Sequence, residues 1–526
     1  MGGLILGDIL ERNAKLFGDR EALVFENRRF THRQHLERVY RLANALIAHG
    51  VQKQDRIAIL ARNGNEYMEV FGAAEVAGFI VVNLNYRLSV PELTALCRDS
   101  APAVLIYAEL FAEAAEALCG EVESIRLAVA IDAAPRQIPP RVTLADYETA
   151  LAAAPATRPA LRAEPGDLVY IVYTSGSTGK PKGACYTHAA WAEGVRMQSH
   201  EGHGRPDDRM LIVMPLFHIG GKIEAMAFTW FGATIILHAV FDEQTVLESI
   251  RTERVTAAHL APVMVQRLLD HPAFTREGTA SLRWIQYASA PMPLALLERA
   301  LAAFGPILSQ VYGMTECLVG TILKPHQHVL DGDARDQRRL TSAGQPMFGV
   351  DLRIVDEEGR DCPPGTIGEV LLRAPATMAG YWNNHTATVE ALRDGWYHTQ
   401  DLGTEDEDGF IYILDRKKDM VISGGENIYS WEVEEALRRH PAVAEVGVIG
   451  VPDPKWGESV MACVVLREGH HTSAEDLIAH CRTLIASYKK PRHVVFLAAL
   501  PRLFNGKVDK KALRAPHWAG QARQVS

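Results

Sequence analysis

The sequence predicts an α/β protein. A large N-terminal domain of layered α/β subdomains with a small antiparallel β subdomain precedes a small C-terminal α+β domain. Three observations predict this fold class. Short, apolar, β-rich segments alternate with longer amphipathic helical patterns through the first half of the chain. Near residue 342 the pattern changes to strands broken by Gly and Pro turns, and after residue 430 a helix, two strands and a second helix follow.

Length and composition agree with a multidomain enzyme. The chain has 526 residues, for which about two to four domains are expected. Hydrophobic residues make up 48% and charged residues 23%, values ordinary for a globular enzyme. The net charge of −9 provides no strong basic field, so nucleic acid is not expected as a partner.

The N-terminus and the cysteines indicate a cytoplasmic protein. Residues 1–13 form the start of an amphipathic helix and lack the basic segment of a signal peptide. No apolar stretch is long enough for a transmembrane segment, so none is expected. The seven cysteines include no C-x-x-C pair and are interpreted as reduced thiols.

The first half of the chain predicts parallel β-sheet. The pattern at 32–50 predicts a helix that Gly50 ends as a C-cap glycine. Strands are expected at 56–60, 79–84, 103–108, 234–240, 257–262 and 283–290. Because helical patterns separate these strands, the sheets are expected to be largely parallel.

The second half predicts a smaller domain and the boundary that precedes it. Residues 349–374 are expected to form the antiparallel subdomain. Helices are expected at 431–440 and 473–488, and strands at 443–453 and 459–468. The predicted organisation is an N-terminal domain at 1–414, a boundary segment at 415–419 and a C-terminal domain at 420–526.

A glycine-rich loop, "YTSGSTGKPKGA" at 173–184, directly follows the apolar strand at 168–173. It is not a Walker A loop, because Thr174 stands where the first glycine is required and Pro181 follows Lys180. Glycines let backbone N–H groups turn toward an anion, and the hydroxyls and Lys182 add further donors. The loop therefore predicts a phosphate site, the alternative being a solvent-exposed Gly/Ser turn.

This loop is similar to the signature loop of the adenylate-forming superfamily, which comprises acyl-CoA synthetases, adenylation domains of peptide synthetases and beetle luciferases. The segment at 82–93 is typical of the acyl-CoA synthetase branch. Six further segments resemble family motifs in the family's order: "LFHIGG" (216–221), "YASAPMP" (287–293), "QVYGMTE" (310–316), "GWYHTQDLG" (395–403), "YILDRKKDMVISGGENIYSWEVE" (412–434) and "LPRLFNGKVDKKALR" (500–514).

The chain departs from the family pattern at three places. Ala288 and Ser289 stand where two glycines are usual in the adenine-binding segment. Gln400 stands where glycine is usual before Asp401, and Asp415 replaces the more common glycine before the ribose-binding arginine.

The resemblance implies a set of nucleotide-binding residues. Tyr312 would lie beside adenine, Thr315 would contact the α-phosphate, and Glu316 would bind Mg²⁺. Asp401 and Arg416 would hold the ribose. The full set implied for ATP and AMP is Thr174, Ser175, Gly176, Ser177, Thr178, Gly179, Lys182, Ser289, Ala290, Pro291, Tyr312, Gly313, Met314, Thr315, Asp401, Arg416 and Lys507. The catalytic residues implied are Lys507, Thr315, Glu316 and His218.

The resemblance also implies an acyl pocket, a coenzyme A tunnel and a hinge residue. The pocket would be lined by Met197, His218, Ile219, Gly220, Ala288, Gly313 and Met314. Gly424 and Gly425 would line the tunnel. The segment 415–419 would be a hinge about which the small C-terminal domain is mobile, and Lys418 would be the hinge residue. Because the pocket glycines leave room, an acyl group larger than acetate is expected. Lys222 and Glu224 would either bind a polar group of the substrate or form a pair on a helix surface, and the surface pair is favoured.

The implied activity is that of an AMP-forming acyl-CoA synthetase with ATP and coenzyme A as co-substrates and Mg²⁺ as cofactor. A carboxylate attacks the α-phosphorus of ATP, and the coenzyme A thiol then attacks the acyl-adenylate and expels AMP. Medium-chain, long-chain, aryl and hydroxycinnamic acids all remain open, as does a homodimer. The alternatives are an enzyme that loads a carrier protein, a luciferase-like oxygenase and a degenerate non-enzymatic member.

Overall fold

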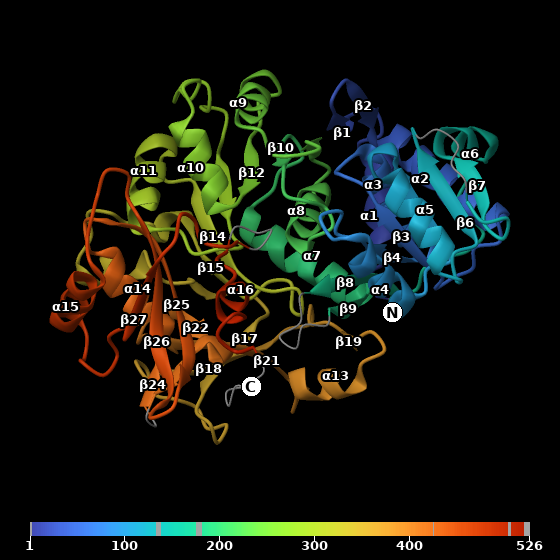
Figure 1. Cartoon of the computed structure of the whole chain (residues 1–526). Coiled ribbons are helices and arrows are strands. Elements are labelled where there is room, and N and C mark those ends of the chain that lie inside the picture. Colours follow the sequence, from blue (N-terminus) through green and yellow to red (C-terminus); the bar gives the residue numbers. More distant parts are fainter. Residues whose placement is uncertain (1–2, 133–137, 175–180, 424–425, 503–506, 520–526) are drawn as a thin grey trace. The chain divides into compact units, whose positions relative to one another are not determined.

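The computed structural model describes residues 3–132, 138–174, 181–423, 426–502 and 507–519. The chain divides into two compact units: unit 1 is Met1–Asp351 with Leu372–Tyr397, and unit 2 is Leu352–Leu371 with His398–Ser526. The predicted hinge at 415–419 stays a prediction, because one conformation does not test where the chain bends between conformations. The α/β class is confirmed by the sheets and helices below (Figure 1).

One sheet of unit 1, here the eight-stranded sheet, is parallel except at one edge. In spatial order, its described strands are β19 (Gly380–Tyr381), β9 (Lys182–Thr187), β8 (Leu168–Thr174), β4 (Ile80–Asn83), β3 (Arg56–Leu60), β5 (Val104–Ala108), β6 (Leu127–Ile131) and β7 (Thr143–Asp146). β8 and β9 pair antiparallel, as do β9 and β19. The strands predicted at 56–60, 79–84 and 103–108 are thereby confirmed as β3, β4 and β5.

The other sheet of unit 1, here the nine-stranded sheet, carries its parallel strands in the middle. In spatial order, its described strands are β16 (Gln345–Pro346), β15 (Thr321–Leu323), β14 (Leu308–Tyr312), β13 (Trp284–Tyr287), β12 (Ala257–Leu260), β10 (Arg209–Ile212), β11 (Thr234–Leu237), β1 (Glu21–Phe25) and β2 (Arg28–Thr31). The strands predicted at 234–240, 257–262 and 283–290 are confirmed, each ending within its predicted segment.

Helices cover both sheets, as parallel sheets require. The helices of unit 1 are α1 (Leu6–Leu16), α2 (His32–Ala48), α3 (Asn65–Ala77), α4 (Val90–Ser100), α5 (Ala112–Glu121), α6 (Tyr147–Ala153), α7 (His188–Gly202), α8 (Ile219–Thr229), α9 (Glu243–Thr252), α10 (Pro262–Asp270), α11 (Leu294–Phe304), α12 (Ala334–Arg339) and α13 (His385–Ala391). α4 and α5 pack on one face of the eight-stranded sheet. α7 and α8 pack side by side (Figure 1). Gly50 follows α2 with φ of +80°, as predicted for a glycine that ends a helix.

A single buried amide joins loops of the two sheets. Asn63, in the loop between β3 and α3, donates from Nδ2 to the carbonyl oxygens of Met214 and His238, both at 3.0 Å. Its Oδ1 accepts from the backbone N–H of Leu216 at 2.8 Å. Met214 and Leu216 lie in the segment that leads to α8, so this amide fixes the start of that helix.

A five-stranded sheet contains the places where the chain passes between the units. Its described strands are β17 (Asp351–Val355), β18 (Gly368–Arg373), β21 (Trp396–Glu405), β20 (Leu392–Arg393) and β22 (Ile411–Arg416), the last paired with β21. β20 and β22 are each antiparallel to β21. The subdomain expected at 349–374 corresponds to β17 and β18.

Unit 2 ends in a small α+β body. Its sheet comprises β24 (Glu426–Ile428), β23 (Val421–Ser423), β26 (Gly457–Leu466), β25 (Val443–Asp453) and β27 (His493–Phe496), and its helices are α14 (Ser430–Arg438), α15 (Ala474–Leu484) and α16 (Lys510–Arg514). Val433, Leu437 and Leu477 anchor α14 and α15 in one apolar core with the sheet. The predicted helices and strands between 431 and 488 are therefore confirmed.

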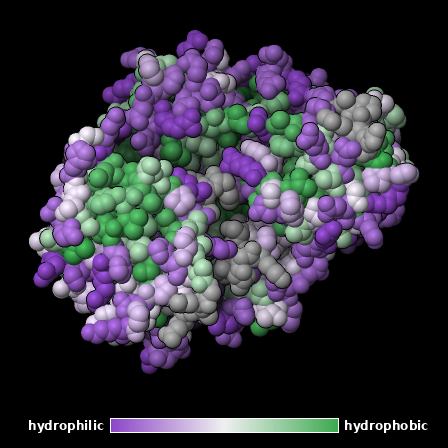
Figure 2. Space-filling model, viewed as in Figure 1, coloured by the Kyte–Doolittle hydropathy of each residue, from purple (hydrophilic) through white to green (hydrophobic). Residues whose placement is uncertain are grey.

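The side of the molecule drawn in Figure 2 is largely polar. Figure 2 shows hydrophilic residues over much of the viewed side, interrupted by smaller hydrophobic areas. Within the described part of the chain, no helix combines the length and hydrophobicity that crossing a bilayer would take.

Candidate active site

The described ends of the glycine-rich loop lie opposite each other. Thr174, the last residue of β8, is the register partner of Lys182, the first residue of β9. Nζ of Lys182 lies 5.1 Å from the ring centroid of Tyr381 on the neighbouring strand β19. The remaining predicted loop residues, Ser175, Gly176, Ser177, Thr178 and Gly179, lie outside the described residues.

The motif that begins at Tyr312 leaves the carboxyl end of β14, the usual place for a ligand site at a parallel sheet. A Cβ atom on Gly313 would lie 2.5 Å from the carbonyl oxygen of Leu318, so this position admits only glycine. The hydroxyl of Tyr186 donates to the carbonyl oxygen of Thr315 at 2.5 Å. Backbone contacts therefore fix the segment that carries Thr315 and Glu316.

Glu316 is suited to hold a hard cation. The hydroxyl of Tyr381 donates to its Oε1 at 2.9 Å, which fixes the side chain of the half-buried glutamate. No group of three or more His, Cys, Asp or Glu side chains among the described residues could hold a metal ion by itself. Mg²⁺ is commonly bound by one or two carboxylates together with substrate phosphates, so one oriented carboxylate fits this ion.

Asp401 and Arg416 form a pair within unit 2. They are register partners on β21 and β22, and Nε of Arg416 lies 2.9 Å from Oδ1 of the buried Asp401. Desolvation and the positive charge of Arg416 lower the pKa of Lys507, and the carboxylate of Asp401 opposes this effect. The structure thus brings together three residues predicted for ribose binding and catalysis.

Two departures from the family pattern have a backbone explanation. Ser289 has φ of +73° and Gln400 has φ of +59°. Both values lie in the left-handed region that favours glycine, the residue usual at these positions in the family. The chain therefore keeps the backbone conformation of the motifs with side chains in place of glycine.

The residues predicted for the acyl pocket come from neighbouring elements of unit 1. His218 precedes α8 as its N-cap, with Ile219 and Gly220 in the first turn. Ala288 directly follows β13, which pairs with β14. Met197 lies buried in α7, and Gly313 and Met314 follow β14. Ser289, Ala290 and Pro291, predicted for adenine binding, continue the segment after β13.

Burial and the positive charge of Arg87 lower the pKa of His218 to about 3, so its ring is neutral at physiological pH.

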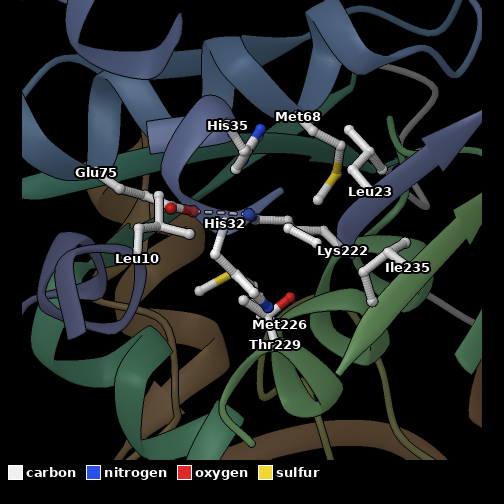
Figure 3. Close-up of a pocket in the computed structure, with 11 residues that line it drawn as sticks. Leu10, Leu23, His32, His35, Met68, Glu75, Lys222, Met226, Thr229 and Ile235 are labelled. Carbon is white, nitrogen blue, oxygen red and sulfur yellow. Dashed lines mark ion pairs between the residues drawn. The ribbon is translucent and has the colours of Figure 1, made fainter. Parts of the chain in front are cut away.

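The prediction that Lys222 and Glu224 form a pair on a helix surface is wrong. Lys222 is 2% exposed and Glu224 is 1% exposed, because α8 is buried on all sides. Residues two apart on a helix point in different directions. Nζ of Lys222 lies 2.7 Å from Oε1 of Glu75, and Figure 3 shows the two side chains pointing toward each other in a pocket below His35. Glu224 instead accepts a hydrogen bond from Gln286.

Sequence reasoning missed several residues of the site. Tyr381 orients Glu316 from a strand 65 positions downstream, and no local pattern indicated this contact. Gln198 and Gln286 lie beside Glu224, and a signal did exist for Gln286: a polar residue inside a buried parallel strand. Lys418 lies in the 3-10 helix Lys417–Asp419, and Gly424 and Gly425 lie outside the described residues.

Comparisons with known proteins agree with these observations. The model of the AMP-binding enzyme family matches residues 10–382, and that of the AMP-binding enzyme C-terminal domain matches residues 432–507. The chain is 38% identical to a feruloyl-CoA synthase of Amycolatopsis sp over 97% of this chain and 98% of the relative. It is 34% identical to a fatty acid–[acyl-carrier-protein] ligase of Streptomyces coeruleorubidus over 96% and 95% of the two chains. Among solved structures, o-succinylbenzoate CoA synthetase from Bacillus subtilis, bound to its acyl-adenylate intermediate, superposes with a TM-score of 0.84 at 31% identity, over 100% of both chains.

Proposed function

The chain belongs to the family of AMP-binding enzymes and is an AMP-forming acyl-CoA synthetase, and we propose that it activates a carboxylic acid larger than acetate. The acid is either aromatic, of the hydroxycinnamate kind, or an aliphatic acid of medium to long chain. The observation that carries this proposal is the similarity over almost the whole chain to a feruloyl-CoA synthase, whose named acyl group is larger than acetate. Relatives named for feruloyl and o-succinylbenzoate substrates support an acid of this size.

In the first half-reaction the carboxylate attacks the α-phosphorus of ATP. An anion attacks a polyanion here, so the site must align the two groups and neutralise charge. Mg²⁺ held at Glu316 would supply part of that neutralisation. Tyr381 orients this carboxylate, Thr315 donates to the α-phosphate, and Lys182 contributes positive charge near the loop. Asp401 and Arg416 hold the ribose.

Lys507 is the proposed catalytic lysine of this step. Its ammonium would donate to the oxygen atoms that gain charge in the transition state, and a donor of this kind contributes about 3–4 kcal/mol. Desolvation and, to a smaller extent, the neighbouring Arg416 lower the pKa of Lys507, while Asp401 favours the charged form.

In the second half-reaction the thiol of coenzyme A attacks the acyl carbon and expels AMP. We assign the tunnel for the pantetheine arm to the strip that contains Gly424 and Gly425, where residues without side chains leave room for the incoming thiol. The C-terminal domain would rotate at 415–419 between the two half-reactions, with Lys418 as the hinge residue.

The test is AMP formation from ATP, coenzyme A, Mg²⁺ and a panel of acetate, octanoate, benzoate and phenylpropenoates. We expect AMP with one or more of the larger acids and little with acetate. Acetate as the best substrate would contradict the proposal.

The second candidate is an enzyme that loads the acyl group onto a carrier protein. The similarity of the chain to a fatty acid–[acyl-carrier-protein] ligase supports this second candidate. The segment at 423–434 resembles the coenzyme A branch of the family, which favours the first candidate. Replacing coenzyme A by a phosphopantetheinyl carrier protein in the same assay decides between them.

The cellular compartment and the oligomeric state complete the proposal. Seven free cysteines support a reducing compartment, and we assign the enzyme to the cytoplasm. A homodimer is the oligomeric state to test, by light scattering coupled to gel filtration.

A further inference from the structure

Three adjacent parallel strands carry polar residues at one level of the nine-stranded sheet. His259 on β12 pairs in register with Gln286 on β13, and Gln286 pairs with Ser309 on β14. All three side chains are at most 2% exposed. Their strand neighbours Leu260, Tyr287 and Leu308 belong to the apolar core on the other face. Buried parallel strands are normally apolar on both faces, so this row of polar side chains is unusual.

Two helices add polar side chains to the same row. Nε2 of Gln198, on α7, donates to Oε1 of Gln286 at 2.7 Å. Nε2 of Gln286 in turn donates to Oε1 of Glu224 on α8. Five buried polar residues from five elements therefore form one cluster, here called the polar wall: Gln198, Glu224, His259, Gln286 and Ser309.

Part of the hydrogen-bonding capacity of the polar wall is unused. Within the described part of the chain, Oε1 of Gln198 and Oγ of Ser309 are buried without a hydrogen-bond partner, whereas the carboxyl of Glu224 interacts with both Gln286 and Gln198. A buried polar atom without a partner costs about 1–3 kcal/mol. These two atoms leave one acceptor and one donor of the cluster available to a ligand.

The polar wall borders the predicted acyl pocket. A Cβ atom on Gly220 would lie 3.0 Å from Cε1 of His259, so the pocket glycine is in close contact with the wall. Glu224 lies one helical turn beyond Gly220, on the same face of α8. Gln286 lies two residues before Ala288, and Gln198 follows Met197.

We propose that the polar wall is the far end of the acyl pocket and binds a neutral hydroxyl group, such as a phenol, at the end of the acid remote from its carboxylate. The proposal rests on the proposed function and narrows its substrate class. A hydroxyl group both donates and accepts hydrogen bonds. The unused groups of the wall can do both in return, because Oε1 of Gln198 accepts and the hydroxyl of Ser309 donates. Burial raises the pKa of Glu224 to about 8, so at neutral pH this side chain is mostly an uncharged acid that can also donate.

A charged end group does not fit. The polar wall contains no Lys or Arg, and burial lowers the pKa of His259 to about 4, which leaves its ring neutral. The nearby cation on α8, Lys222, is engaged with Glu75 in a separate pocket (Figure 3). A second carboxylate on the substrate would therefore lie buried without a counter-charge.

The test compares acids that differ only at the far end. Phenylpropenoic acid and its 4-hydroxy derivative form one pair, decanoic and 10-hydroxydecanoic acids form the other, and decanedioic acid supplies a terminal charge. For at least one pair we expect the wild-type enzyme to favour the hydroxylated acid by 10²-fold or more in kcat/KM. The acid without a hydroxyl group would leave buried polar groups of the wall without a hydrogen-bond partner. Decanedioic acid should be the poorest long-chain substrate.

Variants assign the preference to the wall. Glu224→Leu should reduce the preference for the hydroxylated acid to under about fivefold and improve turnover of the unsubstituted acid. Glu224→Gln, which is neutral and of similar shape, should keep most of that preference. Glu69→Gln replaces another buried glutamate, in α3. It should leave the ratio of the two kcat/KM values unchanged, and that ratio does not depend on the folded fraction.

Each remaining outcome overturns the inference. Wild-type enzyme that treats both members of both pairs alike, or prefers the diacid, refutes the polar wall while acid activation stands. The same conclusion follows if Glu224→Leu lowers activity toward both members of a pair equally. Absence of AMP formation with every acid refutes the proposed function, and the inference falls with it.

Discussion

The hydroxyl of Tyr381 donates a 2.9 Å hydrogen bond to Oε1 of Glu316, and the same ring lies 5.1 Å from Nζ of Lys182. One aromatic side chain therefore connects the proposed metal-binding carboxylate with the strand that follows the phosphate loop. Tyr381→Phe keeps the ring and removes the hydroxyl. A hydrogen bond to a charged group is worth about 1.5–3 kcal/mol, so we expect adenylation to fall roughly tenfold or more.

The expected loss should shrink at high Mg²⁺ concentration, since the variant mainly loses orientation of a ligand. Pyrophosphate release measured across a Mg²⁺ titration checks this. Tyr40→Phe is the matched control, because the Tyr40 hydroxyl also donates to a glutamate, Glu11 at 2.8 Å, outside the proposed site. A Tyr381→Phe enzyme with unchanged Mg²⁺ dependence would show that the contact does not serve metal binding.

Lys507→Ala should separate the two half-reactions. Loss of a preorganised donor predicts a fall of roughly 10²–10³-fold in adenylation, with thioester formation from preformed acyl-adenylate largely retained. Single-turnover assays of each half-reaction measure this. Lys511→Ala, an exposed lysine in α16, serves as the control. Equal losses in both half-reactions would remove Lys507 from its assigned role.

Lys418→Pro should block one half-reaction selectively. Proline fixes φ and removes a backbone N–H, so a hinge at this residue could no longer reach both conformations. The same two single-turnover assays report the effect, and Lys418→Ala, which leaves the backbone free, is the control. If the proline variant completes both half-reactions normally, the hinge lies elsewhere.

The buried pair of Lys222 and Glu75 should matter for folding more than for chemistry. Removing one partner leaves an uncompensated buried charge, so Lys222→Met and Glu75→Gln should each destabilise the protein by about 3–5 kcal/mol. The double variant should recover much of the loss in Tm measured by calorimetry. Lys53→Met, which removes a more exposed partner of Asp167, should cost far less. A double variant as unstable as the sum of both singles would contradict this coupling.

The raised pKa of Glu224 predicts a pH-dependent stability. Burial raises this pKa from 4.5 to about 8, so between these values the unfolded chain loses the proton and the folded protein keeps it. Stability contributed by the protonated form is complete below pH 4.5 and is lost as the pH rises to about 8. The neighbouring His218 and His259 have lowered pKa values and stay neutral above pH 6, and the two glutamines do not titrate.

Glu224→Gln removes this proton equilibrium. The Tm of the variant relative to wild type should therefore rise from pH 5 to about pH 8 and then level. A Tm difference that stays flat across this range would show that Glu224 is ionised in the folded protein.

The elements of this fold could be predicted where local signals were strong. Gly50 with its positive φ and the apolar strands β3, β5 and β12 lie where residue patterns indicate. The motif order also brought Asp401, Arg416 and Lys507 into one prediction, and unit 2 carries all three near one another.

Tertiary burial could not be predicted in the same way. Lys222 and Glu224 have the polarity of a helix surface, yet α8 is buried by neighbours that are distant in sequence. Each side chain is accommodated by a partner on another element, Lys222 by Glu75 on α3 and Glu224 by Gln286 on β13. Nothing within a window around α8 carries that information.

The contacts of Asn63 limit where segments of related enzymes can be joined in a chimera. Its one amide binds three backbone groups, of Met214, Leu216 and His238, from segments more than 150 residues away. A chimera that takes the residues around Asn63 from one parent and the segment before α8 from another must reproduce all three bonds or lose the position of His218. Because the three partners are backbone groups, only Asn63 must keep its identity, and a chimera preserves the bonds if the backbone of the loops at 214–216 and 238 keeps its path.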